Sequence, residues 1–380
     1  MILYLLIATI SILLACLVNN REIKGEIGSI KIKNEITRRQ GINFLSLLSV
    51  FVVLFLPAAL RLEVGNDYES YVDTIHEIYV GGYVVTEPLF NLLVKFLCEC
   101  SGGENYLLVF AFFSFITLWI FLKAIYEQTE DFPLTFYLFM TLGIYFRTYN
   151  TMRYYLVLAI TLFSFRYLLK KEYIKFLLLI VFSSFLHKSV LVVIPLYFLA
   201  ILPWKKWFIF FMGIGAVTIF LLQDLILNIA LELYPSYKNT VFLTSESGLR
   251  GNLMTIARCG AVLIFGLLFY KEGIKEKKEN LFYFKLNVLA LALYTCGSFL
   301  PLVGRIGYYL ITAHILLIPS IIGAISNKKL KKICFLAVVL GAGIYFILFL
   351  RTGHEAGVRI LPYKSWLFYE KEFLNAETIF

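Results

Sequence analysis

Charged residues are scarce in this chain. They make up 16% of its 380 positions, whereas a soluble domain carries about 25%. Hydrophobic residues account for 60%, and the mean hydropathy is +0.81. This balance excludes an ordinary soluble domain and predicts an all-α polytopic membrane protein. Because the apolar segments extend through the whole sequence, we expect one multi-pass membrane domain over residues 1–380.

Cysteine is also sparse and shows no pattern of a metal site. Six cysteines are scattered, mostly within apolar runs, and no spacing resembles a ligand set. The near-adjacent pair Cys98 and Cys100 suits a strained disulfide poorly. No spacing among the outer carboxylates demands a divalent ion. We therefore expect no metal and no cofactor.

Basic segments outside the expected loops are absent as well. The net charge is +10, but in a membrane chain such an excess usually reflects topology. We therefore expect the lipid bilayer as a partner and no nucleic acid. The first apolar run lacks both a preceding basic residue and a small-residue cleavage site, so it is expected to be a span and not a signal peptide.

Apolar runs are the dominant pattern. About 20 residues are needed to cross about 30 Å of hydrocarbon, so the runs 173–187 and 189–203 are short. Short spans thin the bilayer or line a water-filled cavity. We expect about 12 transmembrane helices, at 2–18, 43–60, 106–124, 133–147, 153–169, 173–187, 189–203, 207–226, 253–270, 282–300, 306–323 and 333–350.

Lysine-rich clusters set the expected orientation. With twelve spans and the N-terminus outside, all of them fall on the cytoplasmic side. Counting 87–100 as a thirteenth span would place every later cluster outside. We therefore interpret 87–100 as an interfacial or re-entrant helix in an outer loop. The clusters lie at 21–39, 170–175, 205–206, 271–278 and 328–332.

Arginine and lysine then separate by side. The inner side holds 18 Lys and 4 Arg, and the outer side holds 5 Lys and 8 Arg. Lysine provides the positive charge that keeps a loop on the cytoplasmic side. Arginine is preferred where a planar guanidinium must form paired hydrogen bonds with a carboxylate or phosphate. Alternatively, the excess of arginine on the outer side arises by chance, together with arginine side chains that extend from helix ends to the membrane surface.

Three outer segments are substantial, at 61–105, 227–252 and the tail 351–380. The first segment alternates carboxylates with tyrosines. This combination suits sugar rings, because their C–H faces stack on aromatic rings and their hydroxyls donate hydrogen bonds to carboxylates. The alternative is a solvated amphipathic loop, in which Asp67 only caps a helix starting near Tyr68 and Glu87 only precedes a helix starting at Pro88. The tail segment RILPYKSWLFYEKEF is amphipathic, and we expect it to lie on the membrane.

Polar groups gather at the outer ends of the spans. Arg153, His187 and Arg305 come to the same side. Asn150 and Arg153 share a helix face at i, i+3. The alternatives are that outer arginines such as Arg147 and Arg351 snorkel, and that His187 caps a helix. Ser183 lies at i, i+4 from His187, and His314 lies mid-span and is expected in the core.

Several short motifs in this order resemble the EpsG/Wzy group of bacterial polysaccharide polymerases. The usual glutamine after the motif arginine is replaced by Tyr154, and Leu186 stands where a phenylalanine usually precedes the histidine. The matching residues are Gly65, Asp67, Tyr68 and Tyr71, then Glu87, Pro88 and Phe90, then Asn150 and Arg153, then His187, Ser189 and Pro195, and finally Arg305, Tyr308 and Tyr309.

The resemblance implies a GT-C-type membrane glycosyltransferase in the bacterial cytoplasmic membrane, with its active site facing outward. Its donor and acceptor would be undecaprenyl-pyrophosphate-linked glycans, and a regulator of chain length would be a further partner. The charge of the leaving pyrophosphate must be stabilised, and the acceptor hydroxyl must lose its proton. The expected catalytic residues are His187, Asp67 and Glu87. The expected sugar-binding residues are Tyr68, Tyr71 and Asn150. For pyrophosphate we expect Arg153 and Arg305 first, then Arg147, Arg250, Arg258 and Arg351.

Three other functions compete with this interpretation. A flippase or transporter for the same lipid-linked sugar should show internal repeats or broken helices in matching halves, and the chain shows no repeat. A membrane O-acyltransferase would need a histidine facing the cytoplasm, but His187 is expected outside. An O-antigen ligase would use the same donor with a different acceptor.

Overall fold

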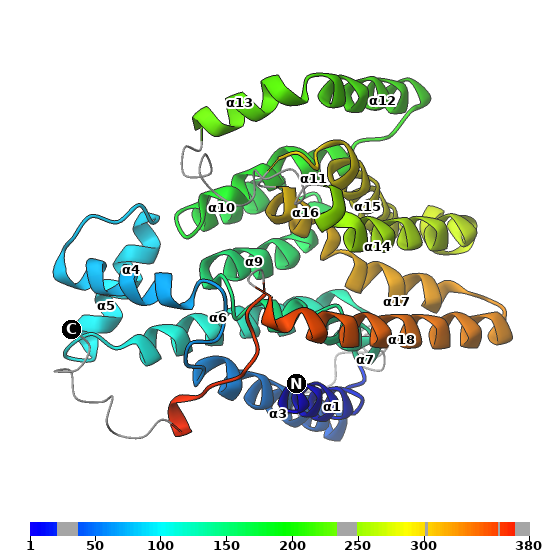
Figure 1. Cartoon of the computed structure of the whole chain (residues 1–380). Coiled ribbons are helices and arrows are strands. Elements are labelled where there is room, and N and C mark those ends of the chain that lie inside the picture. The colour runs from blue at the N-terminus through cyan, green and yellow to red at the C-terminus, as the bar shows by residue number, and fades with distance from the viewer. Residues whose placement is uncertain (21–36, 234–248, 301–302, 356–357, 369–380) are drawn as a thin grey trace. The chain divides into compact units, whose positions relative to one another are not determined.

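The computed structural model describes residues 1–20, 37–233, 249–300, 303–355 and 358–368. The regular secondary structure of these residues is helical, apart from one isolated bridge between Arg61 and Ser365 (Figure 1). The expected apolar runs all lie on helices. These helices are α1 (Ile2–Ala15), α3 (Arg38–Ala59), α6 (Tyr106–Gln128), α7 (Phe132–Thr141), α8 (Ile144–Arg147), α9 (Met152–Leu169), α10 (Tyr173–Ser184), α11 (Val193–Ile201), α12 (Lys206–Leu221), α13 (Gln223–Leu233), α14 (Leu249–Leu268), α15 (Lys278–Cys296), α16 (Val303–Ile311), α17 (His314–Ala324) and α18 (Lys328–Arg351).

Some of the runs are interrupted within the membrane-length segment. The run 133–147 breaks between α7 and α8 at Gly143, whose φ of +74° is left-handed and therefore favours glycine. The run 207–226, which we expected to form one span, bends by 77° between Lys206–Ile219 and Gln223–Ile229. Apolar composition predicts helix at both places but carries no signal for the break.

Five helices of the described chain are long and apolar enough to cross a membrane, and the bent pair α12–α13 would make a sixth. The five are Arg38–Ala59, Tyr106–Gln128, Met152–Leu169, Val303–Ala324 and Lys328–His354. Shorter apolar helices include α1, α7 and α10. The structure therefore supports an all-helical membrane-integral protein, and the number of twelve spans stays a prediction.

The chain divides into two compact units, which are described separately. Unit 1 comprises residues 1–164, 181–188 and 333–380, and unit 2 comprises residues 165–180 and 189–332. The expectation of one membrane domain over residues 1–380 stays a prediction. Of the lysine-rich segment 21–39, residues 21–36 lie outside the described residues, as do residues 234–248 of the second outer loop.

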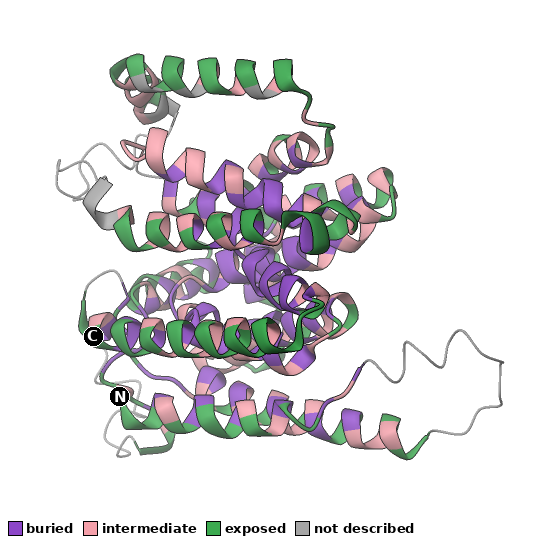
Figure 2. Cartoon of the chain, turned by 90° about the vertical axis from the view of Figure 1, so that its right-hand side faces the viewer, coloured by how far each residue is buried: buried purple, intermediate pink, exposed green. Residues whose placement is uncertain are grey.

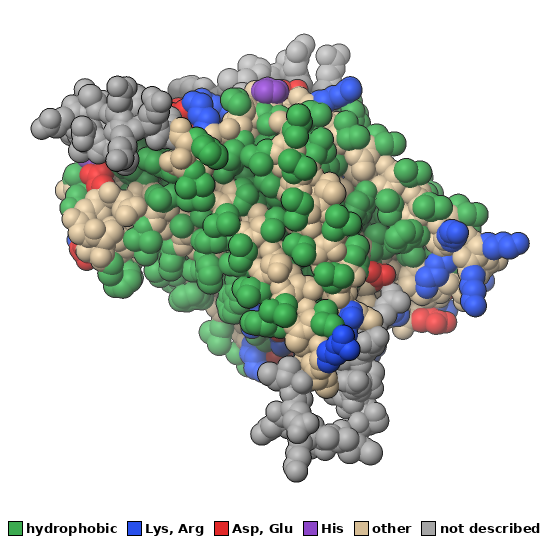
Figure 3. Space-filling view, turned by 90° about the horizontal axis from the view of Figure 1, so that it is seen from below, with side chains coloured by type: hydrophobic (Ala, Val, Ile, Leu, Met, Phe, Trp, Pro, Cys, Tyr) green, Lys and Arg blue, Asp and Glu red, His purple; other side chains and the backbone are tan. Residues whose placement is uncertain are grey.

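In unit 1, α3 packs against both α1 and α6. It begins with a capping box, in which Thr37 and Gln40 satisfy each other's backbone N–H groups. Large hydrophobic side chains on the outer faces of α1 and α3 are exposed, among them Leu6, Leu13 and Phe44. Hydrophobic side chains also dominate the face in Figure 3, and the helices in Figure 2 carry separate buried and exposed sides. Such a surface suits contact with lipid.

Between α3 and α6, unit 1 carries two shorter helices that pack on each other, α4 (Tyr68–Val80) and α5 (Pro88–Cys100). Helix α4 ends at Gly81 in the left-handed conformation, the usual way for a helix to stop. Helix α5 begins with proline at its first position, where a missing N–H costs nothing. A helix at 87–100 was expected, and the structure contains it. Its interfacial or re-entrant position stays a prediction.

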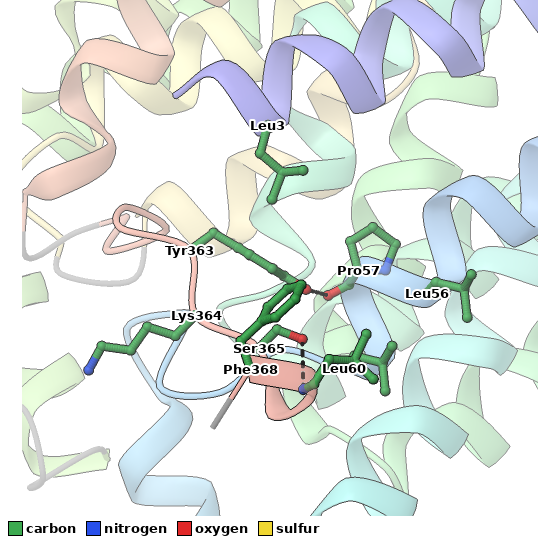
Figure 4. A pocket seen from close by; sticks show the side chains of 9 residues that line it. Leu3, Leu56, Pro57, Leu60, Tyr363, Lys364, Ser365 and Phe368 are labelled. Carbon is green, nitrogen blue, oxygen red and sulfur yellow. Dashed lines mark hydrogen bonds between the residues drawn. The ribbon is translucent and has the colours of Figure 1, made fainter. Parts of the chain in front are cut away.

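Residues 358–365 of the C-terminal tail pack into unit 1, and the expectation that the tail lies on the membrane stays a prediction. Ile360 is fully buried, and its carbonyl oxygen accepts a hydrogen bond of 2.5 Å from the Tyr4 hydroxyl. The Tyr363 hydroxyl donates to the carbonyl oxygen of Pro57 at 3.0 Å (Figure 4). Beside it lies an open, mostly apolar pocket of about 590 Å³, lined by α1, α3 and residues 363–368.

In unit 2, α15 packs against α11, α14, α16 and α17. The Asn287 side chain donates to the Cys259 carbonyl at 3.1 Å and contacts Nε2 of His314 at 2.7 Å. His314 is completely buried, as expected for a core residue. Asn287 thus satisfies the Cys259 carbonyl and one ring nitrogen of His314, which lowers the cost of burying these groups.

Candidate functional site

A tight turn at Gly65 and Asn66, before α4, packs against the residues that precede α9. Gly65 has a φ of +107°, and a Cβ placed on it would lie 2.1 Å from the Tyr149 carbonyl oxygen. No side chain fits such a gap. The Gly65 N–H donates to the Arg359 carbonyl at 2.9 Å, and the Asn66 N–H donates to Oδ1 of Asn150 at 3.2 Å. The glycine is therefore required because two backbone segments touch here.

Asp67 follows this turn and does not act as a helix cap. It occupies the N-cap position of α4, but its side chain makes no capping hydrogen bond. Instead, its Oδ2 accepts a hydrogen bond of 2.6 Å from the Thr151 hydroxyl. The side chain is half-buried. The alternative that Asp67 only caps α4 is therefore wrong, and its carboxylate joins the first outer loop to the segment before Arg153.

Glu87 is the residue that connects the remaining motifs. Its Oε2 forms an ion pair with Nη1 of Arg153. Its Oε1 accepts the Lys188 N–H at 3.0 Å and lies 3.4 Å from Nδ1 of His187. A backbone hydrogen bond of 3.0 Å from Leu89 to Phe185 fastens the start of α5 to the end of α10. Glu87 therefore does more than precede a helix, because its carboxylate contacts both Arg153 and His187.

The charge state of Glu87 follows from these contacts. Burial alone would raise its pKa, but the contact with His187, the Lys188 N–H and the positive charge of Arg153 outweigh it and lower the pKa to about 2. The carboxyl is therefore ionised at neutral pH. Its partners bind the charged form, which is the condition for a depressed carboxyl pKa.

Arg153 lies in the first turn of α9 between two aromatic rings. Its guanidinium carbon lies 5.0 Å from the centroid of Phe90 and 5.7 Å from that of Tyr71, which is cation–π geometry. Its Nε lies 3.5 Å from the Tyr71 hydroxyl. Burial raises the pKa of Tyr71, so this hydroxyl keeps its proton. The arginine side chain retains 17% of its surface exposed, so a ligand can reach it.

His187 lies at the break after α10, where its N–H still bonds to the Ser183 carbonyl at 3.1 Å. Its side chain is 10% exposed. The ring of Tyr154 meets the imidazole edge-on at 5.9 Å. The tyrosine that replaces the usual motif glutamine therefore contacts the histidine through its ring. The expected i, i+4 relation of Ser183 and His187 is present.

The two tyrosines expected to bind sugar do not lie on the surface. Tyr68 is 4% exposed and stacks on Phe110 with ring centroids 4.6 Å apart. Tyr71 is 5% exposed and supports Arg153. Neither ring presents a face on which a sugar could stack, because packing has covered both. The expectation that Tyr68, Tyr71 and Asn150 bind sugar stays a prediction. Asn150 is also buried, and its side chain holds the turn at Asn66.

The other expected pyrophosphate residues, Arg305 and the four reserve arginines, are distributed over both units. In unit 1, Arg147 lies 5.0 Å from the Phe349 ring centroid, and Arg351 is exposed at the end of α18. In unit 2, Arg258 is half-buried on α14 and Arg305 is exposed on α16. The Arg250 side chain lies outside the described residues. On α16, Tyr309 bonds to the Ser189 hydroxyl at 3.0 Å, so two further motifs meet within unit 2.

Arg61 is a residue that sequence reasoning missed. It is 1% exposed and lies between the rings of Phe110 and Tyr149, at 4.7 and 5.5 Å. It also donates to the Ala58 carbonyl and, at 3.1 Å, to the Ser114 hydroxyl. At the end of an apolar run such an arginine is expected to snorkel outward. No pattern in the sequence marks its burial behind the Tyr149–Thr151 segment.

The cluster combines an accessible cation, two carboxylates and an imidazole, and we call it the Glu87 cluster: Asp67, Glu87, Arg153 and His187. Within the described residues, no group of three or more His, Cys, Asp or Glu side chains could hold a metal ion. Chemically, the cluster offers a positive charge for an anionic group and two proton acceptors, Asp67 and His187.

One of three comparisons with known proteins finds a match. Searches of curated proteins and of solved structures return no match to the chain. A family model does match, over residues 44–365, and these residues include each of the motifs that meet in the Glu87 cluster. Membership supports a polysaccharide-polymerase type of role for a membrane-integral enzyme. The chain belongs to the EpsG family.

Proposed function

We propose that this protein polymerises polyprenyl-pyrophosphate-linked oligosaccharide repeat units at the outer face of the bacterial cytoplasmic membrane. One observation carries the proposal. Motifs from four separate segments, at Asp67, Glu87, Arg153 and His187, meet in unit 1 through direct contacts. Packing alone has no need to assemble two carboxylates, an imidazole and a cation at the end of apolar helices, because buried charge is costly there.

The proposed reaction is a glycosyl transfer. The oxygen of an acceptor sugar hydroxyl forms a bond to the anomeric carbon of the donor glycan, and the bond from that carbon to the pyrophosphate oxygen breaks. The electron pair leaves with the lipid pyrophosphate, and the hydroxyl proton passes to a base of the protein. Arg153 is the proposed cation for the leaving group, and the role expected of Arg305 stays a prediction. His187 and Asp67 are the proposed bases.

The proposed topology keeps twelve spans and places the Glu87 cluster outside. It is supported by the lysine clusters of the sequence, such as Lys328–Lys332 at the start of α18. The short helices α10 and α11 on either side of His187 would leave room for a lipid tail to approach between helices. We also propose undecaprenyl pyrophosphate as the lipid carrier.

The test uses purified protein in a lipid bilayer with one lipid-linked repeat unit. A ladder of products supports a polymerase, a single product on another lipid supports a ligase, and transport without any product supports a flippase. Arg153→Ala should reduce the ladder by at least about 100-fold, a loss typical of a group that stabilises transition-state charge. The control Lys95→Ala changes an exposed cation of α5 and should leave the ladder unchanged. A full ladder from stably inserted Arg153→Ala protein would refute the role of Arg153.

A further inference from the structure

The contacts of Glu87 separate it from the two candidate bases. Its side chain is 10% exposed, and both carboxylate oxygens are engaged, by Arg153 on one side and by Lys188 and His187 on the other. An effective base has a pKa near the working pH, whereas the pKa of Glu87 lies at about 2. A carboxylate so strongly held in its ionised form accepts a proton poorly, so its role lies elsewhere.

Arg153 has a second means of support that is independent of Glu87. The rings of Phe90 and Tyr71 lie 5.0 and 5.7 Å from the guanidinium carbon, and the Tyr71 hydroxyl lies 3.5 Å from Nε. Phe90 comes from the same helix as Glu87, one turn later. The arginine would therefore keep its place if the Glu87 carboxylate lost its charge. The His187 ring contacts the carboxylate of Glu87 and the edge of Tyr154, so a change at Glu87 acts directly on the imidazole.

Charge balance sets the third constraint. The Glu87 cluster contains two carboxylates and one arginine, so with a neutral histidine its net charge is negative. A pyrophosphate group that approaches Arg153 meets a cation already paired with an anion. Two anions competing for one guanidinium weaken each other's binding.

We propose that Glu87 is a positioning residue that orients His187 toward the acceptor and occupies Arg153 until the anionic group of the donor takes its place. The inference rests on the proposed function and adds a gate at Arg153, where the Glu87 carboxylate and the donor pyrophosphate compete for the same guanidinium. The donor pyrophosphate displaces or shares the Arg153 contact, and the imidazole stays oriented by the other carboxylate oxygen. The ligand class at the gate is a diphosphate anion, whether free or carried by a lipid.

The variant Glu87→Gln keeps the shape of the side chain and removes its charge, so the two parts of the role separate. Without the competing anion, inorganic pyrophosphate should bind to the purified protein about threefold more tightly or better, measured by isothermal titration calorimetry. With His187 no longer oriented by a charged partner, kcat for the ladder should fall by about tenfold or more, while KM for the donor does not rise. A residue with a merely structural role would weaken both.

Two controls frame this test. Glu99→Gln changes an exposed carboxylate of the same helix, paired with Lys95 at 4.0 Å, and should change neither quantity. Glu87→Asp keeps the charge on a shorter side chain and should shift both quantities in the same direction as Glu87→Gln but by less. It also serves if Glu87→Gln fails to insert.

The outcomes distinguish the inference from the proposed function. Weaker pyrophosphate binding in Glu87→Gln, or unchanged kcat, overturns the inference even if the wild-type protein makes a ladder. If the wild-type protein makes no ladder but Glu87→Gln still tightens pyrophosphate binding, the proposed function fails and the gate at Arg153 stands.

Discussion

Gly65 shows how a single residue determines the position of a candidate catalytic group. Because the turn presses against the Tyr149 carbonyl oxygen, the side chain of Asp67 can reach Thr151. Any Cβ at position 65 would push the two segments apart by more than the 2.6 Å hydrogen bond between Thr151 and Asp67 tolerates. The close approach of the turn to the segment before α9 therefore requires glycine at position 65.

Gly65→Ala should destabilise the protein by about 2 kcal/mol or more and abolish polymer formation, because a left-handed φ and a clash combine. Gly81→Ala is the matched control. Gly81 is also left-handed, with a φ of +80°, but a Cβ there has open space, so it should cost only about 1 kcal/mol. Thermal unfolding in detergent measures both. Equal losses for the two variants would show that the contact with Tyr149 is unimportant.

Stability should depend on pH through Glu87. Its pKa falls from an ordinary value of 4.5 to about 2 on folding, so the unfolded chain binds a proton at higher pH than the folded one. The stabilisation is therefore complete above about pH 4.5 and is lost as the pH falls toward 2. The difference in thermal stability between wild-type protein and Glu87→Gln should be constant from pH 7 to about pH 5 and shrink below it. A constant difference down to pH 3 would contradict this assignment.

At the scale of elements, the tail is the least expected part of the fold. Residues 358–365 join the end of α3 through backbone hydrogen bonds of 3.0 Å from Leu62 to Lys364 and from Trp366 to Leu60. The same segment supplies the Arg359 carbonyl to the turn at Gly65. The tail therefore holds the loop that carries Asp67.

Ile360→Ala should lower the free energy of unfolding by about 2–5 kcal/mol, because it removes a fully buried side chain and leaves a cavity. Phe368→Ala, at a position that is 86% exposed, should change it by less than about 0.5 kcal/mol. Chemical unfolding followed by tryptophan fluorescence compares the two. Should Ile360→Ala prove as stable as wild type, the tail would not anchor the loop.

The sequence predicts features that depend on neighbouring residues better than features that depend on contacts between distant segments. Apolar runs are local, so helices appear at the expected positions, and Pro88 begins α5 because proline is favoured at a first helical position. The Glu87 cluster was expected as candidate residues, since motif order placed them on one side. The pairing of Glu87 with Arg153 and the burial of Tyr68 and Arg61 depend on contacts between distant segments. A single sequence contains no pattern for such contacts.

For the whole molecule, the central expectation is the orientation of the helices. α18 is long and apolar enough to cross the membrane, and it begins among four lysines at 328–332. Cys100 is exposed at the end of α5, in the loop that carries Glu87. If the lysine cluster lies inside, Cys100 and the start of α18 lie on opposite sides of the membrane.

A membrane-impermeant maleimide should label Cys100 on intact cells. In a variant with a cysteine in place of the exposed Lys329, with Cys100 changed to serine, the label should appear only after permeabilisation. Mass spectrometry of the labelled peptides locates the sites. Labelling of the new cysteine on intact cells would reverse the orientation and place the Glu87 cluster in the cytoplasm.

The hydrogen bond between Tyr4 and Ile360 spans 356 positions of the sequence, and this has a consequence for biogenesis. Helix α1 is synthesised long before the segment around Arg359 that completes the turn at Gly65. A nascent chain therefore contains Glu87, Arg153 and His187 before the Arg359 carbonyl can fix the loop that carries Asp67. We expect the Glu87 cluster to be complete only once that later segment has been made.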